Sequence, residues 1–337
     1  MKIIGKNNRI VCSLFSLAIF FAVANSAPCK SDTTLDNWKE NLKIEAIKKG
    51  ISKSTVDLAI DDFKPIKRVI ELDRRQPEFT LTLDQYLKRV VPSRRIKKGR
   101  LMLAKNNKIL EEIGKKYSVQ PRFIIALWGI ETDFGRLDGG FSVVHSLATL
   151  ALDGRRSKFF RRELIRALRI LDQGHINLRD MRGSWAGAMG HFQFMPSSFE
   201  NFAIDYDNDG KRDIWRNKKD AFASAANYLS KSGWKSDQTW GREVRTPDGF
   251  DRTYINSKSF KLMSKWRSLG IKRANGRDLP SRELLGALVK SKNSDNKVYL
   301  VYSNYFTILK WNRSLYFAVA VGILADAIVS KNNKPRR

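Results

Sequence analysis

The stretch ALWGIETDFG, residues 126–135, places a single glutamate, Glu131, at the end of an apolar run. Pro121 stands where helices often begin and Gly135 where they often end, so the sequence predicts a helix over 121–134. On that helix Glu131 continues an apolar face that includes a tryptophan. Burial without a partner would favour the protonated carboxyl, which is the form that a general acid needs. The alternative is a structural glutamate that caps or salt-bridges the helix end.

The pattern of the whole chain predicts a mainly α (α+β) protein. Breaks at glycine and proline divide it into segments. These segments are an N-terminal helical region at 34–115, a central helical region at 116–234, a small α+β insertion at 235–303 and a C-terminal helix at 304–331 that returns to the core. Within the central region we expect further helices at 155–173, from Pro196 onward and at 218–231.

The first segment, 1–26, has the pattern of a secretory signal peptide: a basic head, a short apolar run and small residues. We therefore expect an exported, periplasmic protein. Lipoprotein anchoring at Cys29 is disfavoured, because Pro28 and Ser26 occupy positions where a lipobox has a small residue and a leucine. The other cysteine, Cys12, leaves with the signal peptide, so the mature chain can form no intramolecular disulfide.

The chain is strongly basic, with 63 lysines and arginines against 34 acidic residues and a net charge of +29 at pH 7. Basic runs such as SRRIKKGR (93–100) raise the question of nucleic acid. The export signal and the spread of charge along the chain argue against it and favour an anionic envelope polymer or surface. The apolar run at 315–329 is short for a bilayer and contains Asp326, so it is interpreted as a core helix.

The ionisable residues disfavour several kinds of enzyme. The three histidines are scattered, and no HExxH, CxxC, GxSxG or glycine-rich phosphate loop occurs. The carboxylate nearest to Glu131 is Asp133, which on a helix points to a different face and is interpreted as a helix-end or surface charge. Ordinary glycosidases use two carboxylates, so a single candidate acid requires different chemistry.

A second distinctive block is GSWAGAMGHFQFMPSSF, residues 183–199. Its glycines and alanines suggest that the backbone passes close to something bulky. Gln193 lies between Phe192 and Phe194, and an aromatic floor with an amide suits a sugar site. The alternative is a tightly packed turn that leads into a helix with Pro196 at its first position.

The segment DYDNDGKRDIWR (205–216) has the pattern of a calcium loop, with Asp205, Asp207 and Asp209 at positions 1, 3 and 5. Position 12 should supply a bidentate carboxylate, but it is Arg216. We therefore expect no required cofactor and at most weak calcium binding. The alternative is an Asx-rich turn whose acids are neutralised by nearby lysine and arginine.

Glu131 and the blocks that follow it resemble the membrane-bound lytic murein transglycosylase B family, which has a goose-type-lysozyme-like catalytic core. The matching motifs are WGIETDFG (128–135), SWAGAMGHFQFMPSSF (184–199), DYDNDGKRDIW (205–215), ASAANYLSKSGW (223–234) and WNRSLYFAVAVGILAD (311–326), with QPEFT (76–80) and YLKRVV (86–91) before them. The resemblance implies a lysozyme-like helical catalytic core over 116–234.

The resemblance also implies an activity and a set of site residues. Family members cleave the bond between N-acetylmuramic acid and N-acetylglucosamine in peptidoglycan and leave 1,6-anhydro ends, with the glutamate at the position of Glu131 as acid and then base. The residues expected to bind substrate are Ser184, Gln193, Tyr228, Asn312, Arg155, Arg156 and Trp311. Trp311 stands where a tyrosine is common. The implied partner is the glycan strand, bound by a monomer.

Two alternatives to a lytic transglycosylase remain. One is a non-catalytic peptidoglycan-binding or scaffolding protein on the same fold. The other is a muramidase that releases reducing ends. The intact Glu131 favours an enzyme, because a binding module need not keep an acid at that position.

Overall fold

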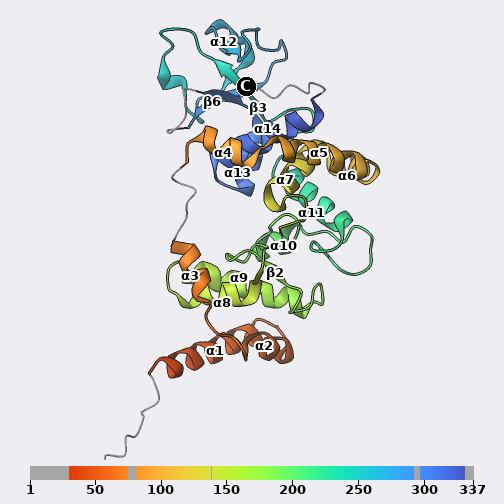
Figure 1. Cartoon of the computed structure of the whole chain (residues 1–337), viewed down its shortest axis with the longest axis vertical. Coiled ribbons are helices and arrows are strands. Elements are labelled where there is room, and N and C mark those ends of the chain that lie inside the picture. Colours follow the sequence, from red (N-terminus) through yellow and green to blue (C-terminus); the bar gives the residue numbers. More distant parts are fainter. Residues whose placement is uncertain (1–29, 75–80, 138, 292–296, 331–337) are drawn as a thin grey trace, which may run out of the picture.

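The computed structural model describes residues 30–74, 81–137, 139–291 and 297–330. They form an elongated molecule, with α1 (Lys30–Lys48) and α2 (Lys53–Ile60) at one end and α12 (Met263–Ser268) at the other (Figure 1). The predicted signal peptide, both cysteines and the QPEFT motif lie outside the described residues.

Two of the N-terminal helices, α2 and α4, begin where a side chain accepts hydrogen bonds from free backbone N–H groups. Ser52 accepts a hydrogen bond from the backbone of Thr55 at the start of α2. Thr82 and Gln85 form a capping box at the start of α4 (Leu83–Val90). The other helices of this region are α3 (Lys67–Arg74), α5 (Ser93–Lys105) and α6 (Asn107–Tyr117).

The central region contains the predicted helices and one more. Those predicted from the sequence are α7 (Pro121–Thr132), α9 (Ser157–Asp172), α10 (Pro196–Phe202) and α11 (Lys218–Lys231). The sequence prediction omits α8 (Val143–Leu152), which packs along α9. Its sequence VVHSLATLAL is apolar on nearly every side because the helix is almost wholly buried, so it lacks the amphipathic period by which surface helices are found.

The insertion folds around a small antiparallel sheet with strand order β4-β6-β7-β3-β5. Its strands are β3 (Gly241–Arg245), β4 (Lys261–Leu262), β5 (Lys272–Arg273), β6 (Leu285–Lys290) and β7 (Val298–Val301). Met263 and Trp266 of α12 pack with Leu288 and Leu300 of the sheet in an apolar cluster separate from the main core. This is the small α+β insertion that the sequence predicts.

The C-terminal segment corrects one prediction, because the single helix expected over 304–331 is two helices. The helix direction bends by 119° between α13 (Ser303–Trp311) and α14 (Leu315–Val329). Asn312 has extended backbone, and the Ser314 side chain accepts a hydrogen bond from the backbone of Phe317 to start the second helix.

α14 is the core helix that its sequence predicts, since it packs against α7, α13 and α5 with most of its side chains buried. Gly322 allows the close approach of Trp240: a Cβ at Gly322 would lie 2.1 Å from the indole. Among the described residues no single helix is long and apolar enough to cross a membrane, and only α13 and α14 taken together, across their bend, reach that length and composition.

Candidate active site

Glu131 lies in the last turn of α7 and is half-buried. The indole Nε1–H of Trp311 donates a hydrogen bond of 2.9 Å to Glu131 Oε1. The sequence expectation of an unpaired acid on an apolar face is therefore wrong: the carboxylate has a partner, contributed by the end of α13, 180 residues further along the chain.

The end of α7 is bonded to the glycine-rich block. Thr132 Oγ1 donates to the carbonyl oxygen of His191 at 2.8 Å and accepts from the backbone of Gly135 at 3.0 Å. Gly135 has a φ of 76°, and a Cβ there would lie 2.5 Å from the His191 ring. Trp128 Nε1 donates to His191 Nδ1 at 3.2 Å. Sequence reasoning missed this role of His191. The only indication in the sequence was that His191 directly precedes the segment in which Gln193 lies between two phenylalanines.

Asp133 is a buried helix-end charge, so the helix-end interpretation is right and the surface interpretation is wrong. Its carboxylate lies 2.7 Å from Arg136, 3.5 Å from Arg95 and 3.7 Å from Lys98. Burial would raise the pKa of Asp133, but the hydrogen bond from Arg136 and the charges of Lys98 and Arg95 outweigh it and hold the pKa below its ordinary value. Asp133 is thus an ionised structural group.

The small residues of the block 183–199 are required by contacts within the protein. Gly187 has a φ of 85° and lies against Leu147, where a Cβ would come within 2.4 Å. Gly190 has a φ of 66° and lies against the backbone of Ile214, where a Cβ would come within 2.6 Å of the carbonyl oxygen. The tightly packed turn is therefore sufficient to explain these glycines.

Two predicted site residues are built into this turn. Ser184 Oγ accepts a hydrogen bond of 3.0 Å from the backbone of Ala188. Gln193 has a φ of 49°, and its Nε2 donates to Gly190 O at 3.2 Å. Both side chains are half-buried.

The aromatic residues of the block pack under Trp311 instead of forming an open floor. Phe192 and Phe194 are 2% and 3% exposed, with ring centroids 6.2 and 5.3 Å from that of Trp311. The ring centroids of Tyr228, on α11, and Trp311 lie 4.6 Å apart. The Tyr228 hydroxyl donates a hydrogen bond of 2.7 Å to the carbonyl oxygen of Lys310. Glu131, Trp311 and Tyr228 therefore form one chain of contacts.

The other predicted residues lie apart from that chain. Asn312 is exposed at the bend between α13 and α14, where its Oδ1 accepts from the backbone of Ser314 at 3.1 Å. Arg155 and Arg156 precede α9 and bind the buried Asp73 of α3, at 3.2 and 2.6 Å. Each arginine side chain is still about half exposed, at 54% and 45%.

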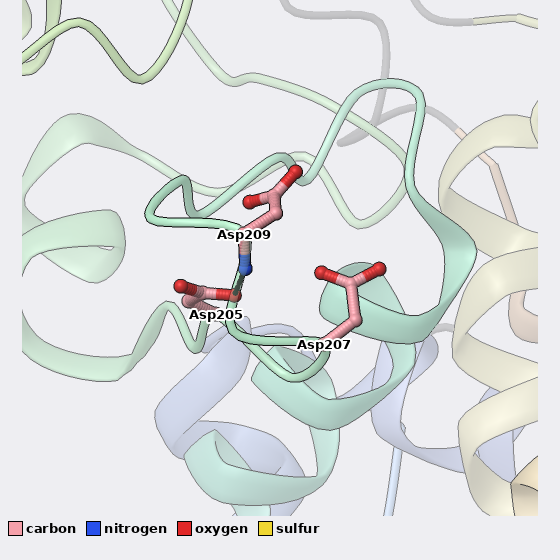
Figure 2. Close-up of side chains that lie close together, drawn as sticks. All are labelled: Asp205, Asp207 and Asp209. Carbon is pink, nitrogen blue, oxygen red and sulfur yellow. Dashed lines mark hydrogen bonds between the residues drawn. The ribbon is translucent and has the colours of Figure 1, made fainter.

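The acidic loop between α10 and α11 gathers three carboxylates (Figure 2). One ligand oxygen from each of Asp205, Asp207 and Asp209 lies within 4.8 Å of the others. Asp205 also accepts hydrogen bonds from the backbone of Asp209 and Gly210, which shapes the turn. Arg216, at the position where a calcium loop would supply its last carboxylate, binds Asp180 at 2.8 Å.

Sequence reasoning missed a fourth carboxylate beneath this loop. Asp220 at the start of α11 is fully buried and accepts backbone hydrogen bonds of 2.8 Å from Tyr206 and Asp213. Burial, with the charges of Asp207 and Asp205, raises the pKa of Asp220 to about 6. Hard carboxylate oxygens with excess negative charge are the donors that calcium prefers, so the residues present fit that ion.

The helical core with a glutamate at the end of α7 has the lysozyme-like fold that the family resemblance implies. A family model described as "Transglycosylase SLT domain" matches residues 34–326. The chain belongs to this family of transglycosylases.

Three relatives give the degree of similarity. Membrane-bound lytic murein transglycosylase B of Escherichia coli is 29% identical over 251 residues, covering 72% of this chain and 66% of that protein, so the match spans just under two thirds of that relative. SltB3 from Pseudomonas aeruginosa, solved with NAG-anhNAM-pentapeptide, is 40% identical over 87% of this chain and 79% of that one, with a TM-score of 0.84. Slt35 of Escherichia coli, solved with calcium, is 25% identical over 86% and 92%, with a TM-score of 0.74.

Proposed function

We propose that this chain is a lytic transglycosylase that cleaves peptidoglycan between N-acetylmuramic acid and N-acetylglucosamine and leaves 1,6-anhydro-N-acetylmuramic acid ends. The observation that carries the proposal is the half-buried Glu131, held by Trp311 at the end of α7 in a member of the transglycosylase family. SltB3 has been solved with NAG-NAM-pentapeptide and with NAG-anhNAM-pentapeptide, which supports the same substrate class here.

One carboxylate is sufficient for this reaction. Glu131 donates its proton to the glycosidic oxygen as the bond from that oxygen to the anomeric carbon breaks. The 2-acetamido oxygen of the muramic acid stabilises the anomeric carbon in place of a protein nucleophile. The Glu131 carboxylate then accepts the proton of the 6-hydroxyl, and O6 bonds to the anomeric carbon to close the anhydro ring. Water takes no part, and Glu131 ends in its starting state.

Further residues complete the proposed site. Ser184, Gln193 and Asn312 supply hydroxyl and amide contacts to the sugars, while the exposed parts of Arg155 and Arg156 suit the carboxylates of the stem peptide. The protein acts as a periplasmic monomer without a required cofactor. The acidic loop, with Asp220 beneath it, would hold a calcium ion weakly, as a structural charge at a distance from the proton transfers.

Digestion of purified sacculi, followed by mass spectrometry, tests the proposal. The main products should be lighter by one water than their lysozyme counterparts and should resist borohydride reduction. Glu131→Gln should lower the rate by about 10²–10⁴-fold. Its melting temperature should be equal or higher, because glutamine keeps an oxygen for the Trp311 hydrogen bond and removes a partly buried charge.

The alternatives predict different results. Reducible ends as the main product would identify a muramidase and require a second catalytic group. Binding to sacculi without release of fragments would identify a scaffolding protein. A folded Glu131→Gln variant that keeps most of the activity would show that Glu131 is structural.

A further inference from the structure

We propose that Asp73, in the last turn of α3, is a positioning residue that holds Arg155 and Arg156 side by side as a binding site for the carboxylates of the stem peptide. The inference rests on the proposed function, in which both arginines contact the stem peptide. It assigns the geometry of that contact to an acid that lies 82 residues before Arg155 in the sequence.

Asp73 contacts both guanidinium groups, one with each carboxylate oxygen. Oδ1 accepts a hydrogen bond of 2.6 Å from Arg156 Nη2. Oδ2 lies 3.2 Å from Arg155 Nη1, which also donates to the backbone carbonyl oxygen of Asp73 at 3.0 Å. The acid is 1% exposed, whereas the arginine side chains are 54% and 45% exposed. Asp73 therefore lies on the protein side of the pair, and both cations reach solvent.

The charges of this cluster suit an anionic ligand. Two neighbouring guanidinium groups repel each other, and the carboxylate that both contact offsets that repulsion. Two cations and one anion leave a net charge of +1, which attracts a further anion. A guanidinium group has five N–H donors in one plane, and each contact with Asp73 uses one terminal nitrogen. Donors on the solvent side of the pair can therefore bind a carboxylate with two parallel hydrogen bonds.

Arg156 is held in a defined orientation by more than this ion pair. Its φ of 70° is left-handed, a conformation that a long side chain adopts only where contacts hold it. Its guanidinium group lies over the buried ring of Phe160, 4.9 Å from the centroid. Stacking on the ring restrains the guanidinium plane, and the bond to Asp73 restrains its rotation within that plane. Less conformational freedom is then lost when a ligand binds.

Other contacts attach α3 to the core without Asp73. The backbone N–H of Ile66, directly before α3, donates to Thr149 Oγ1 at 3.0 Å. Arg74 pairs with Asp153 at 3.0 Å. A buried ion pair adds little to stability, because removing its charges from water costs about as much as their attraction returns. Orientation of the two arginines therefore explains the buried acid better than attachment of the helix does.

Asp73→Asn tests the proposal, because it keeps the shape of the side chain and removes its charge. Two substrates are compared: a defined glycan oligomer whose stem peptides have free carboxyl groups, and the same oligomer with those groups converted to amides. The KM for the acidic oligomer should rise about tenfold, because misoriented arginines lose a charge-assisted contact. The KM for the amidated oligomer, which never makes that contact, and kcat for both should change by less than about threefold.

Further variants make the result specific. In a background with Arg155→Ala and Arg156→Ala, Asp73→Asn should have no additional effect on KM, because it acts through those arginines. Arg156→Lys keeps the charge, loses the planar set of donors and should also raise the KM for the acidic oligomer, which tests orientation with Asp73 intact. Asp153→Asn is the matched control: it breaks the ion pair with Arg74 and should leave both KM values unchanged. Thermal unfolding of each variant confirms that it is folded.

The outcomes separate this inference from the proposed function. Wild-type protein that yields no anhydro ends contradicts the function itself. If wild-type protein yields them and Asp73→Asn raises KM equally for both oligomers, Asp73 is structural and the positioning role is wrong. A lower KM for the acidic oligomer would show that Asp73 only offsets the positive charge of the arginines, and an unchanged KM would show that they need no positioning. Equal KM values for the two oligomers with wild-type protein would exclude the carboxylate contact and overturn the inference as well.

Discussion

Glu131 and Asp133 lie two residues apart, and the structure gives their carboxylates opposite environments. Glu131 accepts a hydrogen bond from a neutral donor, the indole of Trp311, whereas Asp133 lies among three cations. A neutral donor leaves a carboxyl group able to take up and release a proton. Three cations keep a carboxylate ionised. The division of roles between an active acid and a structural one is therefore set by partners on other helices.

Asp133→Asn should destabilise the protein at neutral pH by about 3–5 kcal/mol, because it leaves Arg95 and its neighbours without their buried anion. The pKa of Asp133 is lowered in the folded state, so its contribution is present above the ordinary value of about 3.9 and is lost as the pH falls through the lower folded value. Urea unfolding at about pH 7 and in steps down to about pH 3 should show the difference from wild type shrinking with acid.

Asp237→Asn is the control for this experiment, because Asp237 pairs with Arg282 on the surface and is 61% exposed. Its effect should stay within about 0.5 kcal/mol at every pH. A loss for Asp133→Asn that is independent of pH would show that shape, not charge, explains the effect.

The sequence predicted Glu131 as the acid from helix periodicity, but it could not supply its partner. Periodicity reports which face of a helix is apolar, not what packs on that face. Trp311 ends α13 at a bend, and α13 is held there by packing against α14 and by the hydrogen bond from Tyr228 of α11 to Lys310. The buried Asp220 was missed for the same reason, since nothing in its local sequence distinguishes it from a surface aspartate at a helix start.

At the scale of elements, predictions succeeded where a proline marks the start of a helix, even for a helix as buried as α7, and for α11, whose start is capped by Asn217. α11 has the predicted bounds, and Pro121 and Pro196 begin α7 and α10 as expected. Prediction failed for α8, which is buried on nearly all sides. It also failed at the bend after α13, where the short polar segment Asn312–Ser314 interrupts a long apolar pattern.

Calcium binding by the acidic loop can be tested directly. With a dissociation constant near millimolar, 5 mM calcium should stabilise the protein by about 1 kcal/mol, seen as a modest rise in melting temperature. Asp207→Asn should abolish the rise while sparing the turn, because Asp205, not Asp207, accepts the backbone hydrogen bonds that shape it. A micromolar constant by calorimetry would show that Asp213 or a backbone group completes the shell despite Arg216.

At the scale of the whole molecule, charge is the dominant feature. The chain has a net charge of +29, and its lysines and arginines occur along the whole sequence. On α5, Arg94, Lys97 and Lys105 are exposed, and in the insertion Lys272 and Arg277 are exposed as well. A spread of this kind favours an extended anionic polymer over a single anionic partner group.

This distribution predicts how the protein binds sacculi. Binding of the inactive Glu131→Gln variant, measured by co-sedimentation, should weaken steeply with salt, because exposed charges are screened over about 10 Å at 0.1 M. Two charge-reversed derivatives, Arg94→Glu with Lys97→Glu and Lys272→Glu with Arg277→Glu, remove the same net charge from opposite parts of the chain. If attraction is spread over the whole surface, both should lower affinity to a similar extent and reduce the salt dependence. A loss confined to one derivative would locate a single binding patch, and binding indifferent to salt would assign the affinity to the site around Glu131 instead.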